Sequence, residues 1–149
     1  MYTVEEFDEK KTKVMSYILY KKRTEYEVRK KFSSTIDEDM LDDIIEYVKE
    51  AGYINDSEYV KKLFNEYMNL KSMSIREMKN KVYSKGVYVD YIEDYISKNR
   101  EALEEYELES IKKIIDKKKR TMEPQKLMAY LLNRGFDPDI IAKIERNKD

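Results

Sequence analysis

Two basic side chains and a tyrosine share one face of a helix expected over residues 74–85. Arg76, Lys79 and Tyr83 are spaced i, i+3 and i+7, so they project from the side opposite the apolar positions. Cations beside an aromatic ring can bind phosphates, an acidic protein surface or a nucleic-acid base. An ordinary solvated helix surface would show the same pattern. The residues of this helix that we predict to contact a partner are Arg76, Lys79, Lys81, Tyr83 and Lys85.

Two further basic groups extend the predicted partner-binding surface. The counterpart face of an earlier helix, over residues 24–32, carries Tyr26, Arg29 and Lys30, and residues 117–120 form a dense basic run. That run lies at the end of an apolar helical pattern, where cations also complement the helix dipole, so a structural role is an alternative. These groups add Arg29, Lys30, Lys117, Lys118, Lys119 and Arg120 to the candidates.

The residue types exclude many kinds of catalysis and metal binding. The chain has no Cys and no His, which excludes thiolate or imidazole zinc sites, Cys–His and Ser–His nucleophiles, and imidazole proton transfer. Acids cluster over residues 37–43, but the glycine and distal Glu of a calcium loop are missing, and helix-dipole complementation explains them. Three separated glycines cannot make a phosphate-binding glycine-rich loop. We therefore predict a protein that is not an enzyme and uses no metal or cofactor.

Composition indicates an all-helical protein. Only 3 Gly and 2 Pro occur, too few for the frequent turns of an all-β chain. The N-terminus lacks the apolar stretch of a signal peptide, and no segment approaches the roughly 20 apolar residues of a membrane span, so a cytoplasmic protein is expected. Residues 57–100 contain 9 bases against 6 acids, a net of +3, within a chain of net charge −1. This middle third is the part expected to meet a polyanion or an acidic partner.

Three stretches of the chain repeat one helical pattern with a period of about 50 residues. Each places two apolar residues four positions apart on one helix face, after a capping Thr24 or Ser74 or a helix-starting Pro124. Gly86 and Gly135 lie near the ends of the second and third stretches, at positions typical of C-terminal cap glycines. The stretches cover residues 24–32, 74–87 and 123–136.

A longer helix is expected before each stretch and a short amphipathic helix after it, which predicts three tandem three-helix repeats. We place these repeats at residues 1–56, 57–100 and 101–149. A unit of about 45 residues hides its own apolar face poorly, so neighbouring repeats stack into an elongated, curved array with a long surface. The expected flanking helices include residues 8–22, 37–50, 57–70, 88–98 and 104–119.

The chain has four segments, at residues 25–32, 51–56, 75–87 and 131–141, that together resemble the RecX family of recombinase regulators. In the second of them, Gly52 is expected to end a helix, Tyr53 and Ile54 to pack, and Asn55 or Asp56 to cap the next helix. The second segment resembles the family signature Gly-Tyr-apolar-Asp-Asp, but here Asn55 replaces the first Asp. Many relatives are also more basic than this chain. The third segment ends in Lys-Gly-Val, and the fourth contains the sequence Arg-Gly-Phe.

This resemblance implies a function that helical periodicity does not. A chain of this family is expected to dock in the groove of a RecA–DNA filament and to inhibit ATP hydrolysis and strand exchange, modulating recombination and DNA repair. Direct contact with the DNA backbone is expected to be weak because the chain is nearly neutral. The expected oligomeric state is a monomer.

Two other functions remain open from the residues alone. Three-helix units also occur in helix-turn-helix proteins that bind DNA. The candidate recognition helices, over residues 37–50 and 88–98, are acidic, whereas a helix in the major groove usually carries Arg, Asn or Gln. The other alternative is a helical repeat scaffold with an unrelated partner, which only the RecX resemblance disfavours.

Overall fold

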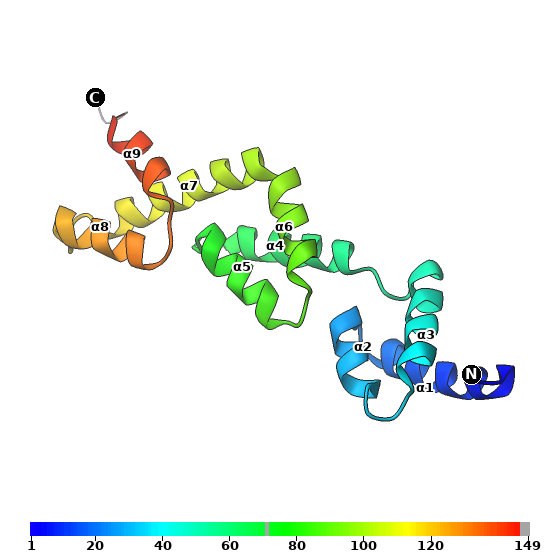
Figure 1. Cartoon of the computed structure of the whole chain (residues 1–149). Coiled ribbons are helices and arrows are strands. Elements are labelled where there is room, and N and C mark those ends of the chain that lie inside the picture. Colours follow the sequence, from blue (N-terminus) through cyan, green and yellow to red (C-terminus); the bar gives the residue numbers. More distant parts are fainter. Residues whose placement is uncertain (71, 147–149) are drawn as a thin grey trace.

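The computed structural model describes residues 1–70 and 72–146, which form nine α-helices and no strand (Figure 1). We group the helices into repeat 1 (α1–α3), repeat 2 (α4–α6) and repeat 3 (α7–α9). In each repeat the first helix packs against the third. The all-helical prediction is therefore confirmed. The helices are α1 Val4–Tyr20, α2 Glu25–Phe32, α3 Glu38–Glu50, α4 Asp56–Leu70, α5 Ile75–Ser84, α6 Val89–Lys98, α7 Arg100–Lys118, α8 Pro124–Asn133 and α9 Pro138–Arg146.

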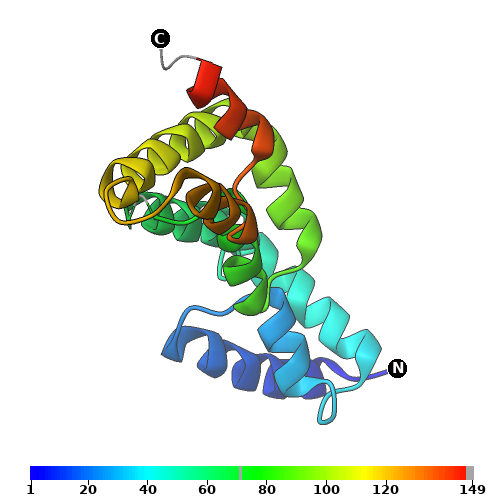
Figure 2. The ribbon, with the colours of Figure 1, turned by 90° about the vertical axis from the view of Figure 1, so that its left-hand side faces the viewer.

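The three repeats follow one another in space as they do in sequence. In Figure 1 the chain runs diagonally from α1 near the N-terminus to α9 near the C-terminus, and the last repeat does not fold back onto the first. Figure 2, turned by 90°, shows the same succession from repeat 1 at the bottom to α9 at the top. This arrangement agrees with the elongated, curved array expected from the sequence. Among the described helices, none combines the length and apolar character needed to cross a membrane.

Local capping explains where several helices begin. The Thr24 hydroxyl accepts a hydrogen bond from the backbone N–H of Glu27, whose side chain accepts one from the backbone N–H of Thr24. Ser74 and Glu77 form the same capping box at the start of α5, as the sequence predicts. The expected start of the first helix at residue 8 is wrong, because α1 begins at Val4, four residues earlier, and Thr3 caps it. The expected start of α7 at residue 104 is also too late, since that helix begins at residue 100.

Three hydrophobic clusters hold the fold together. The first runs from Val14 to Ile54, the second from Val60 to Tyr106, and the third from Ile111 to Ile144. The second cluster therefore takes side chains from the beginning of α7 as well as from repeat 2. The division of the chain at residues 56 and 100 stays a prediction. Because α7 serves both clusters, repeats 2 and 3 share a continuous helix at their junction.

The segment between α3 and α4 follows its predicted arrangement except at Tyr53. Tyr53 is 45% exposed, so the expectation that it packs is wrong, whereas Ile54 is buried. Asn55 caps α4, because its Oδ1 accepts a hydrogen bond from the backbone N–H of Glu58 at 3.1 Å. Asp56 does not cap this helix; it is 4% exposed and lies beneath the start of α2 instead.

Candidate partner-binding groove

The start of α2 meets the turn between α5 and α6, although these segments are far apart in the sequence. The Thr24 hydroxyl donates a hydrogen bond to the carbonyl oxygen of Gly86 at 2.6 Å, and Thr24 is fully buried. Tyr26, in the first turn of α2, packs over Gly86 and meets the Tyr88 ring edge-on at 6.1 Å between centroids. These contacts place one face of repeat 1 beside the predicted partner-binding residues of repeat 2.

Two adjoining hollows, of about 540 and 490 Å³, lie at this contact. They share Tyr26, Lys30, Ser84 and Gly86, so they form one continuous surface, which we call the inter-repeat groove. One wall comes from α1 and α2 and the other from the end of α5 and the start of α6. The residues that line the groove are Tyr17, Tyr26, Glu27, Lys30, Lys31, Tyr83, Ser84, Lys85, Gly86, Val87, Tyr88 and Val89.

The groove combines exposed aromatic rings with unpaired positive charge. Tyr83 is 61% exposed and Tyr26 41% exposed. Lys30 and Lys85 are exposed, and neither forms an ion pair within residues 1–70 and 72–146. The lining acid, Glu27, is already used by the capping box and by an ion pair with Arg23 at 3.8 Å. Such a surface can bind an anionic group through its lysines and a flat group through its rings.

Three of the residues predicted from the sequence meet in this groove, namely Lys30, Tyr83 and Lys85. Arg29 lies elsewhere, because its guanidinium pairs with Glu25 at 3.1 Å and with Asp42 at 2.6 Å. Those ion pairs occupy Arg29 within repeat 1, so it is a weaker candidate than its neighbour Lys30.

The remaining predicted residues of α5 make contacts outside the groove. Lys79 forms an ion pair with Glu93 of α6, which ties it within repeat 2. Lys81 is exposed and its Nζ lies 5.0 Å from the centre of the Tyr67 ring. Arg76 is exposed at its tip, but its aliphatic part packs beside Gly135 of repeat 3. These three residues therefore do not join the inter-repeat groove.

The basic run at residues 117–120 lies at the end of α7, in repeat 3, whereas the groove lies between repeats 1 and 2 (Figure 1). Lys118 has its Nζ 4.8 Å from the centre of the Tyr130 ring, and Lys119 pairs with Asp116 at 3.6 Å. Lys117 and Arg120 are exposed. A single compact ligand cannot reach both this run and the groove, and whether either contacts a partner stays a prediction.

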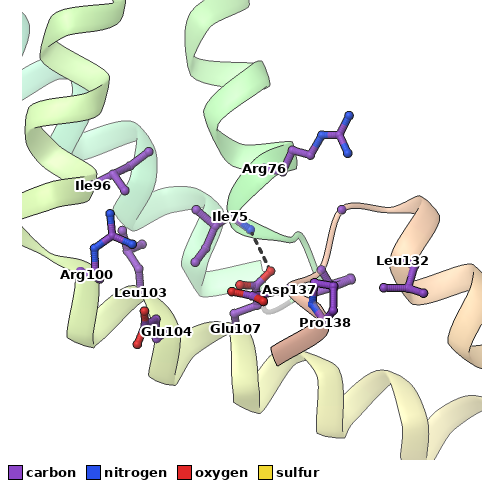
Figure 3. A pocket seen from close by; sticks show the side chains of 12 residues that line it. Ile75, Arg76, Ile96, Arg100, Leu103, Glu104, Glu107, Leu132, Asp137 and Pro138 are labelled. Atoms are coloured by element: carbon purple, nitrogen blue, oxygen red, sulfur yellow. Dashed lines mark hydrogen bonds between the residues drawn. The ribbon is translucent and has the colours of Figure 1, made fainter. Parts of the chain in front are cut away.

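A second cavity, of about 440 Å³, lies between repeats 2 and 3 (Figure 3). Its charges oppose one another, since Arg76 and Arg100 share the lining with Glu104, Glu107 and Asp137. Figure 3 shows the Glu107 carboxylate beside the Asp137 side chain and bonded to the backbone N–H of Ile75. Because its three acids outnumber its two cations, the cavity is a poorer candidate than the groove for an anionic partner.

Two buried carboxylates support the starts of α2 and α5. Burial raises the pKa of Asp56 to about 6, although a hydrogen bond from the backbone N–H of Glu25 opposes the shift. Burial raises the pKa of Glu107 to about 7; the Ile75 N–H opposes this rise and the nearby Asp137 carboxylate adds to it. Neither acid was predicted from the sequence to be functional. Their contacts hold the repeats together and do not form part of the groove.

Sequence reasoning missed several lining residues of the groove as candidates. Helix spacing places Tyr26 on the same face as Arg29 and Lys30, but it does not select Tyr88 or Lys31 as partner-binding residues. The spacing within one helix identifies Tyr83 but says nothing about which residues of repeat 1 lie opposite it. A signal was present in Gly86, because a glycine after a helix can also mark a place where another segment approaches closely.

The comparisons with known proteins identify relatives of this chain. Residues 104–144 match the family model described as RecX, third three-helix domain. The chain is 29% identical over 142 residues to Regulatory protein RecX of Clostridioides difficile strain 630, covering 90% of this chain and 65% of that protein. The resemblance to the RecX family is confirmed. RecX of Finegoldia magna is also 29% identical, over 87% of this chain and 67% of its own length.

Other RecX proteins extend the similarity and show its limits. Regulatory protein RecX of Staphylococcus haemolyticus is 29% identical over 87% of this chain, which spans only 50% of that relative. The crystal structure of RecX from Lactobacillus salivarius superposes with a TM-score of 0.73 at 23% identity, covering 97% of both chains. A second RecX crystal structure gives a TM-score of 0.68 at 18% identity, covering 95% of this chain and 73% of the other. These superpositions establish a RecX-like fold.

Proposed function

We propose that this chain is a non-enzymatic regulator that binds the RecA recombinase filament and inhibits its ATP hydrolysis and strand exchange. The observation that carries the proposal is the RecX resemblance, which covers 90% of the chain in the C. difficile relative. That relative is named a regulatory protein, and the resemblance to the RecX family implies RecA as the partner. An elongated array of helical repeats suits such a partner, because it offers a long surface to a polymer of repeated subunits.

The inter-repeat groove is the part of the surface that we assign to the partner. Lys30 and Lys85 carry unpaired positive charge, and Tyr83 and Tyr26 offer large contact areas, which are features of binding hot spots. These groups would contact acidic recombinase surface and, secondarily, DNA phosphates. A recognition helix that enters the DNA major groove is less favoured, because the exposed faces of both α3 and α6 are acidic. The exposed face of α6 carries Asp90, Glu93 and Asp94.

The proposal is tested by DNA-stimulated ATP hydrolysis of RecA on single-stranded DNA. The chain is titrated from far below the RecA concentration, and we expect inhibition at substoichiometric amounts. The double variant Lys30→Glu/Lys85→Glu should raise the concentration for half inhibition about tenfold or more, since each reversal places a repulsive charge in the contact. Lys112→Glu/Lys113→Glu is the matched control, with the same change of charge at exposed positions of α7.

Three outcomes decide between the candidate functions. No inhibition by the folded wild-type chain, even in excess over RecA, would reject the filament proposal. Equal weakening by both double variants would reject the groove as the contact and leave only a general charge effect. Tight binding to duplex DNA in the absence of RecA would favour the helix-turn-helix alternative.

A further inference from the structure

The two junctions between repeats are built from similar contacts. At the first junction the Thr24 hydroxyl donates to the carbonyl oxygen of Gly86 at 2.6 Å. At the second, the Ser74 hydroxyl donates to the carbonyl oxygen of Arg134 at 2.7 Å. Each hydroxyl belongs to the N-cap of the middle helix of one repeat, and each carbonyl belongs to the turn after the middle helix of the next repeat. Both donors are fully buried, so water does not compete for these bonds.

A buried carboxylate completes each junction. Asp56, at the start of α4, accepts a hydrogen bond from the backbone N–H of Glu25 at 3.3 Å. Glu107, on α7, accepts one from the backbone N–H of Ile75 at 3.5 Å. In both cases the acid comes from the first helix of the following repeat and satisfies a free N–H at the start of the preceding middle helix. Similar contacts therefore connect repeat 1 to repeat 2 and repeat 2 to repeat 3.

The second junction has side-chain contacts that the first one lacks. The Arg134 guanidinium pairs with Glu77 of repeat 2 at 2.9 Å and also donates to the carbonyl oxygen of Ser72. The residue equivalent to Arg134 at the first junction is Lys85, which likewise precedes the turn glycine but forms no ion pair within the described chain. Glu27 stands in the position of Glu77 and pairs with Arg23 of its own repeat.

The second junction also has the shorter covalent connection between its helices. A single residue, Asn99, separates α6 from α7, and the first two turns of α7 belong to the core of repeat 2 through Leu103 and Tyr106. Residues 51–55, by contrast, connect α3 to α4 without helical structure. The other contacts across the first junction are those between the Tyr26 and Tyr88 rings and between Lys49 and Tyr91. The inter-repeat groove lies along one side of this junction.

We propose that the chain bends at the first junction. Repeat 1 rotates about the hydrogen bond between Thr24 and Gly86, while repeats 2 and 3 move together as one body. This motion changes the separation of the two groove walls, and with it the distance between Lys30 and Lys85. The inference concerns the isolated chain and does not depend on the identity of the partner. A flexible joint next to a stiff one lets an extended protein adjust its curvature to the surface that it meets.

The proposal is tested by measuring distance distributions between spin labels in the full chain, which is possible without removing native thiols because the sequence has no Cys. One label pair, Glu46→Cys with Ser97→Cys, spans the first junction, and a second pair, Ser97→Cys with Ala142→Cys, spans the other. All three positions are exposed and lie on helices. We expect the first distribution to be at least twice as wide as the second. Equal widths would overturn the proposal.

Exchanging the two cations provides a second measurement with a matched control. Lys85→Arg should narrow the first distribution, because a guanidinium at this place can reach Glu27 as Arg134 reaches Glu77. Arg134→Lys should widen the second distribution, because the forked contact to Glu77 and Ser72 is lost. If both exchanges leave the widths unchanged, the ties that we identify do not control the bending and the proposal is wrong.

Discussion

Replacement of Glu107 by Gln should stabilise the protein at and above neutral pH. Glu107 is 2% exposed and its pKa is raised from 4.5 to about 7, chiefly by burial. The folded state therefore holds the proton more tightly than the unfolded state, and the free energy of unfolding falls as the pH rises from about 4.5 to about 7. A tenfold difference in acidity corresponds to ~1.4 kcal/mol, so the difference of about 2.5 between the two pKa values sets an upper limit of about 3.5 kcal/mol.

The expected gain is smaller than that limit, because Glu107 borders the cavity of Figure 3 and relaxation of the structure around a buried charge lowers the cost of burying it. We expect the Glu107→Gln variant to be more stable than the wild type by about 1–2 kcal/mol at pH 8 and nearly equal to it at pH 4.5. The amide oxygen can still accept the hydrogen bond from Ile75, so the start of α5 stays supported. Repulsion between the ionised Glu107 and the Asp137 carboxylate is also removed.

Urea unfolding followed by circular dichroism at several pH values measures this effect. The control is Glu105→Gln, an exposed position on the same helix, which should follow the wild-type pH dependence. The wild-type curve should lose stability between pH 4.5 and 7, and the Glu107→Gln curve should be flatter over this interval. Parallel curves for the wild type and Glu107→Gln would refute the idea that burial of this carboxylate costs the folded state free energy.

Two further stability measurements follow from the packing. Gly135→Ala should cost about 2–3 kcal/mol, because φ is +90° and a Cβ would lie 2.7 Å from Cδ of Arg76; Gly52→Ala, with φ +84° and nothing within 4 Å, should cost only about 1 kcal/mol. Equal losses in urea unfolding would show that the neighbouring repeat does not constrain Gly135. Phe136→Ala should cost about 3–5 kcal/mol because Phe136 is 1% exposed, whereas Leu132→Ala, 41% exposed, should cost less than about 1 kcal/mol. A loss for Phe136→Ala as small as that for Leu132→Ala would contradict its place in the core.

The candidate site was only partly accessible from the sequence. Helical spacing correctly selected Lys30, Tyr83 and Lys85 as exposed residues, because exposure on an amphipathic helix follows from its period. The same spacing could not reveal that Arg29 and Lys79 are occupied by ion pairs with neighbouring helices. Those acids come from other elements, and their approach depends on how the helices pack.

What the sequence determined by itself is the set of local structures. The capping boxes at Thr24 and Ser74 and the three repeats rest on contacts between residues three or four positions apart, whose geometry is set by the helix itself. Only the tertiary structure decided the junctions. The bond from Thr24 to Gly86 joins residues 62 positions apart, and Asp56 supports a helix in the preceding repeat. No local rule relates such residues, because their meeting depends on the angle at which one repeat stacks on the next.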